Sequence, residues 1–108
     1  MFVARVEGDS MEPLIPNGAY CLFRYIRDMP REGRPALVWH DGLSDPHTGG
    51  KYTLKYFTVE PPVAWRKPGR VVLKPANKNY EPIILPLEGE GVFRVIAEFL
   101  EVLKGAGT

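Results

Sequence analysis

Cysteine is almost absent from the sequence, which has one such residue, Cys21, among 108. A single thiol excludes an internal disulfide and a cysteine-rich zinc site, and it fits a reducing compartment. No apolar run approaches the roughly 18–20 residues that span a bilayer, and residues 1–6 lack the apolar core of a signal peptide. We therefore expect a cytoplasmic protein without a membrane anchor.

The sequence also has little excess of either charge. The 14 Lys and Arg residues nearly balance the 13 Asp and Glu residues, and the formal net charge is +1. Proteins that bind nucleic acid directly usually carry a strongly basic surface. The charge balance therefore argues against direct nucleic-acid binding.

Apolar residues are plentiful, and they are interrupted by many turn-forming residues. They make up 44% of the chain, which is enough for a core, and the length fits one domain over residues 1–108 with no separate DNA-binding domain. The 11 glycines and 11 prolines stand singly between apolar segments, which is too many for a helical bundle. We predict a mainly β fold with little helix.

Alternating apolar and polar residues locate the strands. Strands are predicted over residues 2–7, 19–25, 35–40, 51–59, 70–74, 81–85 and 92–103. Pro13 and Pro16 limit the segment 10–14 to one helical turn. The segment 41–50, rich in glycine and aspartate, is expected to be an exposed loop.

Ser10 and Lys55 are the candidates for chemistry. A serine hydroxyl needs a base to accept its proton, and a lysine can act as that base only when it is neutral, which requires burial of the amine. Lys55 shares a strand face with Thr53 and Phe57, so partial burial is expected. The backbone N–H groups of Ser10 and Asp9 could form an oxyanion hole. The competing interpretation is that Ser10 only caps a helical turn and Lys55 is solvated.

Two other groups of residues are weaker candidates. His40, Asp41, Asp45 and His47 could bind a metal, or the histidines could serve Ser10 in a triad, but their spacing fits no known metal motif. Solvated turn residues explain them better, and no metal or cofactor is expected. Cys21 lies in an apolar strand, where a buried, inert thiol is expected.

Three segments then resemble, in order, the motifs of the LexA/UmuD family of serine peptidases. VEGDSMEPLIPNG (6–18) resembles the segment that carries the family's nucleophile, and YTLKYF (52–57) is similar to its lysine strand. LKPANKNYEPI (73–83) is similar to a later segment with an Asn-x-x-Tyr-x-Pro-Ile pattern, which we expect to structure the core.

This resemblance implies a compact β fold like that of LexA, UmuD and the signal peptidases, with Ser10 as nucleophile and Lys55 as base and then acid. Relatives act in the SOS response by autoproteolysis, commonly dimerise, and meet a RecA-like, polymerase or repressor partner. Because only nine residues precede Ser10, self-cleavage in cis is not expected, and the substrate would be another peptide or protein. The alternative is a catalytically idle module for dimerisation or partner binding.

Overall fold

The structure, a computed structural model, describes residues 1–31, 33–40, 52–67, 69–87 and 93–104. They form seven strands: β1 (Phe2–Arg5), β2 (Tyr20–Tyr25), β3 (Pro35–His40), β4 (Tyr52–Glu60), β5 (Arg70–Lys74), β6 (Ile83–Pro86) and β7 (Phe93–Val102). The described part of the chain contains no helix, so the prediction of a mainly β fold is confirmed. The predicted loop at 41–50 lies outside the described residues.

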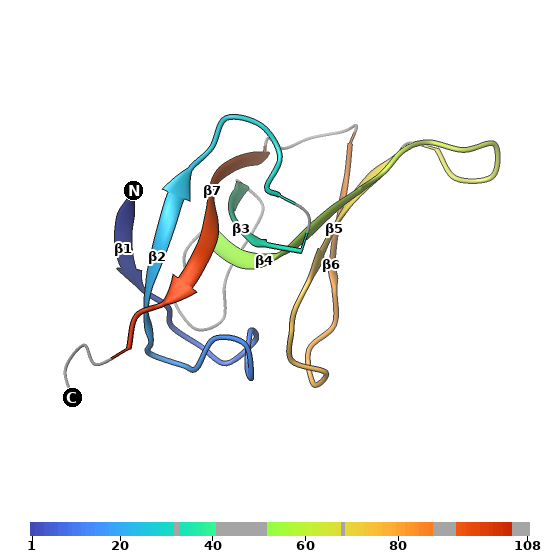
Figure 1. Cartoon of the computed structure of the whole chain (residues 1–108). Coiled ribbons are helices and arrows are strands. Elements are labelled where there is room, and N and C mark those ends of the chain that lie inside the picture. Colours follow the sequence, from blue (N-terminus) through green and yellow to red (C-terminus); the bar gives the residue numbers. More distant parts are fainter. Residues whose placement is uncertain (32, 41–51, 68, 88–92, 105–108) are drawn as a thin grey trace.

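All seven strands belong to one sheet, in the order β1-β2-β7-β3-β4-β5-β6 (Figure 1). Every pairing is antiparallel. Strands β3 to β6 are hydrogen-bonded in chain order, whereas β7 lies between β2 and β3. The last strand therefore joins the β1–β2 hairpin to the rest of the sheet.

Two apolar clusters cover the sheet. The first contains Met11, Ile15, Cys21, Phe23, Leu54, Ala97 and Phe99. The second contains Ala36, Val38, Val71, Leu73 and Leu85, with Phe57 packed against it. Because neighbouring residues of a strand point to opposite faces, Leu54 joins the first cluster while Lys55 shares a face with Phe57 and the second cluster. Burial of this strand on both faces thus places a lysine inside the protein.

One carboxylate, that of Glu98 in β7, is also fully buried. Its Oε1 accepts hydrogen bonds from Arg24 (Nε 3.0 Å, Nη2 2.7 Å) and from Arg31 Nε (2.9 Å), and its Oε2 accepts the Arg31 backbone N–H (2.9 Å). Burial alone raises the pKa of Glu98, but the hydrogen bonds from Arg31 and Arg24 outweigh it and lower the pKa to about 2. Glu98 thus fastens β7 to β2 and to the loop that follows β2.

Candidate active site

The candidate nucleophile, Ser10, lies in a tight turn that follows β1. Gly8 begins the turn with a φ of 91°, a left-handed conformation that favours glycine. Its N–H donates to the Asn17 side-chain oxygen at 2.9 Å, which ties the start of the turn to its end. The Glu12 N–H donates to the Asp9 carbonyl at 3.1 Å. Local hydrogen bonds therefore close the backbone around Ser10.

Two apolar side chains anchor this turn to the core. Met11 is 2% exposed and Ile15 is fully buried, and both belong to the first apolar cluster. The Ile15 N–H donates to the Met11 carbonyl at 2.8 Å, which makes the single helical turn that the prolines were predicted to permit. Ser10, next to Met11, remains partly accessible.

Lys55 reaches this turn from the middle of β4. Its side chain is 5% exposed, so the expectation of partial burial is exceeded and the interpretation of Lys55 as a solvated lysine is wrong. Lys55 Nζ donates to Ser10 Oγ at 2.9 Å and to Thr53 Oγ1 at 2.8 Å. The structure thus brings together two residues that are 45 positions apart in the sequence.

The surroundings of Lys55 are predominantly apolar. Its cross-strand partner in β3 is Ala36, a small and fully buried residue. Thr53, which is 5% exposed, supplies another oxygen within hydrogen-bond distance of the amine besides Ser10 Oγ. The Lys55 side chain is therefore enclosed by β3 and β4 on the side of the sheet.

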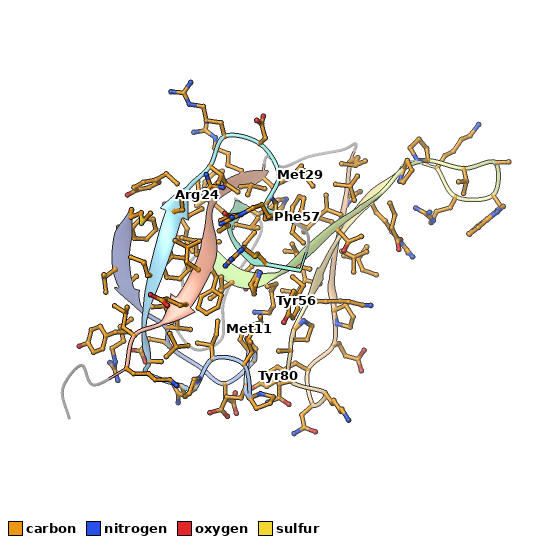
Figure 2. The ribbon with its side chains drawn as sticks, in the orientation of Figure 1. Met11, Arg24, Met29, Tyr56, Phe57 and Tyr80 are labelled. Carbon is orange, nitrogen blue, oxygen red and sulfur yellow. The ribbon has the colours of Figure 1, made fainter. Side chains whose placement is uncertain are left out.

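A third segment, residues 75–80, contacts the nucleophile turn. The Asn77 N–H donates to the Ser10 carbonyl at 2.9 Å, and Asn77 Nδ2 donates to the Asp9 carbonyl at 3.0 Å. The Tyr80 hydroxyl donates to the Asp9 carboxylate, and Tyr80 lies at the same end of the molecule as Met11 (Figure 2).

The same segment also contributes to the core, as expected from the sequence. Within residues 73–83, Leu73 is fully buried in the second apolar cluster, Ile83 packs against that cluster, and Ala76 packs against the first. The sequence did not predict that Asn77 and Tyr80 would also bind the backbone and carboxylate of the nucleophile turn.

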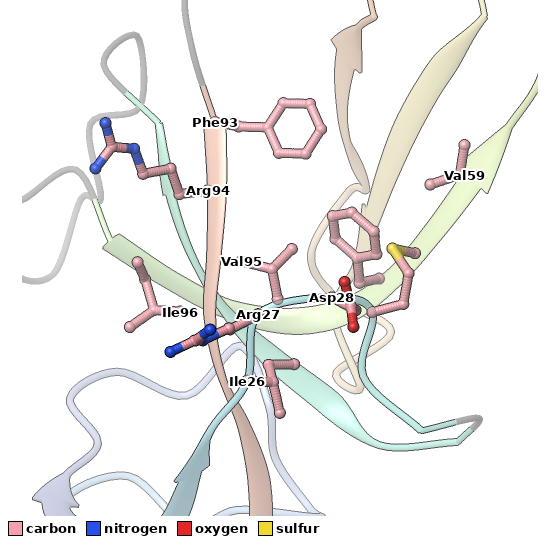
Figure 3. Close-up of a pocket in the computed structure, with 10 residues that line it drawn as sticks. Ile26, Arg27, Asp28, Val59, Phe93, Arg94, Val95 and Ile96 are labelled. Carbon is pink, nitrogen blue, oxygen red and sulfur yellow. The ribbon is translucent and has the colours of Figure 1, made fainter.

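Two cavities are lined by residues of β4 and its neighbours. The smaller, about 160 Å³, is lined by residues next to the candidate site, among them Glu7, Thr53 and Leu54. The larger, about 700 Å³, lies between residues 26–29, β4 and β7 (Figure 3). Its lining includes Phe57, Phe93 and Val95 but neither Ser10 nor Lys55. The smaller cavity is not lined by Ser10 or Lys55 either, although Thr53, whose hydroxyl accepts a hydrogen bond from Lys55, is part of its lining.

The other candidates gain no support within the described residues. Of the possible metal ligands, His40 ends β3, whereas Asp41, Asp45 and His47 lie outside the described residues. No group of three or more potential ligands that could hold a metal occurs among the described residues. Cys21 is fully buried, and burial raises the pKa of its thiol, as expected of an inert cysteine.

Comparison with known proteins identifies the family of the chain. Residues 1–99 match the Peptidase S24-like family, and the chain belongs to this family. A comparison with curated proteins returned no match. Among the described residues, no helix is long and apolar enough to cross a membrane.

Proposed function

We propose that residues 1–108 form a single serine peptidase domain in which Ser10 is the nucleophile and Lys55 the general base. The observation that carries this proposal is the 2.9 Å contact between Lys55 Nζ and Ser10 Oγ, made by a lysine that is 5% exposed. A nucleophile and its base must lie within hydrogen-bond distance, and few structural roles require a buried lysine to face a serine.

The reaction begins when Ser10 Oγ attacks the carbonyl carbon of a peptide bond. Neutral Lys55 accepts the hydroxyl proton, and burial favours this neutral amine because it disfavours the ammonium ion. The carbonyl oxygen becomes an oxyanion, which accepts hydrogen bonds from the backbone N–H groups of Ser10 and Asp9. These two N–H groups supply fixed donors at the place where negative charge develops.

The tetrahedral intermediate then collapses, and the C–N bond of the substrate breaks. Lys55, now an ammonium ion, gives its proton to the leaving amine, so that an acyl group remains on Ser10 Oγ. Water attacks this ester, with Lys55 again accepting a proton, and hydrolysis restores the free serine. The cycle needs no cofactor.

The substrate in this proposal is a peptide or protein segment from another molecule. The homodimer and the RecA-like, polymerase or repressor partners implied by the family resemblance stay predictions.

Cleavage of added peptides by wild type and by Ser10→Ala tests the proposed activity. Peptides containing an Ala–Gly bond, the bond that repressor relatives cut, are incubated with each protein, and products are identified by mass spectrometry. We expect cleavage by wild type and none by Ser10→Ala. Cleavage that persists in the variant would reject Ser10 as the nucleophile, and a wild type without activity would favour the idle binding module.

Thr53→Val is expected to lower kcat by about 10-fold to 100-fold, because Lys55 becomes charged as it takes the Ser10 proton and a hydrogen bond to a charged group contributes roughly 1.5–3 kcal/mol. The Thr53 hydroxyl holds the amine beside Ser10, and valine keeps the shape of the side chain without this acceptor. Steady-state kinetics measure the effect. Thr58→Val, an exposed change on the same strand, is the matched control and should leave kcat unchanged. Wild-type kcat in Thr53→Val would contradict a positioning role for Thr53.

A further inference from the structure

The backbone around Ser10 is oriented by a residue outside the Ser–Lys pair. Asn77 bonds to two successive carbonyls of the turn, that of Asp9 through Nδ2 and that of Ser10 through its N–H. Asn77 follows β5, which pairs with β4 in a register that places Lys74 opposite Tyr56. The segment that carries Asn77 is therefore attached to the strand that carries Lys55.

The geometry of the peptide group gives the contact with Asp9 a consequence. In a trans peptide the C=O of one residue and the N–H of the next lie in one plane and point in opposite directions. Asn77 Nδ2 and the Glu12 N–H both donate to the Asp9 carbonyl, and because they hold it on one side, the Ser10 N–H is directed to the other side of that peptide. Within the described part of the chain, the Ser10 N–H donates to no other group.

The Asn77 side chain can make this contact in one orientation of its amide. Its Oδ1 accepts the Asn79 N–H at 2.9 Å, which leaves Nδ2 to face the Asp9 carbonyl. A flipped amide would place Oδ1 against that carbonyl and lose both bonds. The hydrogen bond from the Asn79 N–H therefore fixes the orientation in which Asn77 Nδ2 faces the Asp9 carbonyl.

We propose that Asn77 is a positioning residue that directs the Ser10 N–H toward the substrate oxyanion. This inference rests on the proposed function. The Asn77 backbone N–H, which holds the Ser10 carbonyl, is present whatever the side chain is. Substitution of Asn77 therefore removes its side-chain bond to the Asp9 carbonyl, while the bonds from the Glu12 N–H to that carbonyl and from Tyr80 to the Asp9 carboxylate remain.

Asn77→Ala and Asn77→Asp test the proposal, with Asn79→Ala as the matched control. Asn79 is exposed, and it contacts Asn77 through a backbone N–H that alanine retains. We expect each Asn77 variant to lower kcat about 10-fold to 100-fold with KM unchanged, because an oxyanion donor acts in the transition state. Unchanged kcat, or a raised KM with normal kcat, would overturn the proposal, as would an equal loss in Asn79→Ala.

A peptide aldehyde supplies a second readout. Ser10 Oγ adds to the aldehyde carbon, the hydroxyl proton passes to Lys55, and the carbonyl oxygen becomes the anion that the Ser10 N–H would bind. Asn77→Ala should weaken aldehyde binding by the same factor as kcat, while binding of the matching peptide amide, measured in the Ser10→Ala background, stays constant. Equal weakening of both ligands would indicate a structural role and reject the proposal.

Amide NMR separates failure of this inference from failure of the proposed function. A wild type that neither cleaves peptides nor binds the aldehyde would reject the peptidase activity. The Ser10 amide signal still reports the orientation of its peptide, and it should shift in Asn77→Ala and stay in place in Asn79→Ala. An unshifted Ser10 signal in Asn77→Ala would overturn the role of Asn77.

Discussion

Replacement of Lys55 by alanine is expected to reduce peptide cleavage by about 10³-fold or more, because Ser10 then has no group to accept its proton. Lys55→Arg should be equally inactive. A guanidinium keeps the positive charge, but its pKa is above about 12, so it cannot act as a base near neutral pH. The comparison therefore separates a need for proton transfer from a need for charge.

The pH dependence of cleavage measures the same requirement in wild type. The rate should rise with pH and level off as the Lys55 amine loses its proton. Lys104→Ala, an exposed lysine in the segment after β7, is the control and should retain the wild-type rate and profile. More than a tenth of wild-type activity in Lys55→Arg, or a flat wild-type profile, would contradict Lys55 as the base.

Glu98→Ala is expected to lower the free energy of unfolding by roughly 1.5–3 kcal/mol, the contribution of hydrogen bonds to a charged group, because the half-exposed arginines can be solvated once the carboxylate is gone. The variant leaves Arg24 and Arg31 facing each other without the carboxylate that both of them bind. Glu98→Gln keeps the volume and one acceptor oxygen, so its loss should be smaller. Urea unfolding measures these differences.

The matched control for this effect is Glu101→Ala, since Glu101 lies in the same strand but is exposed. A surface substitution of this kind usually changes stability by less than about 0.5 kcal/mol. If Glu98→Ala and Glu101→Ala lost equal stability, the cluster around Glu98 would have no special role in the fold.

Acid titration gives Glu98 a second test. Its pKa is about 2 in the folded protein against an ordinary value of 4.5, so the folded state binds the proton less readily than the unfolded state. The stability from Glu98 is therefore fully present above about pH 4.5 and is lost as the pH falls toward 2, a difference of roughly 3 kcal/mol. Glu98→Gln has no carboxyl group to protonate at this position, so its free energy of unfolding should not show this decrease at low pH. Parallel pH curves for both proteins would contradict the prediction.

The strands were predictable because their signals are local. Apolar alternation and flanking turn residues set the bounds of β3 and β5 at the residues that the structure shows. The order of strands was not predictable in this way, because β7 pairs with β2 and β3 across long stretches of sequence. Periodicity along one strand carries no information about which strand lies beside it.

The candidate site was predictable only in part. Ser10 and Lys55 were selected from chemistry and from motif resemblance, since their spacing alone does not bring them together. Asn77 was missed because its contacts are made through an amide and a backbone N–H, which leave no pattern in one sequence. Glu98 was missed because only the folded structure supplies the two arginines that make its burial tolerable.

The central position of β7 has a consequence for the order of events during synthesis. Ser10 lies between β1 and β2, and Lys55 lies in β4, within the part of the sheet from β3 to β6. β7 joins these two parts of the sheet, and it is the last of the seven described strands to be synthesised. A nascent chain that lacks residues 93–102 cannot complete the sheet that connects hydroxyl and amine. The two parts of the sheet that carry Ser10 and Lys55 are therefore joined through β7 only after residue 102 has been synthesised.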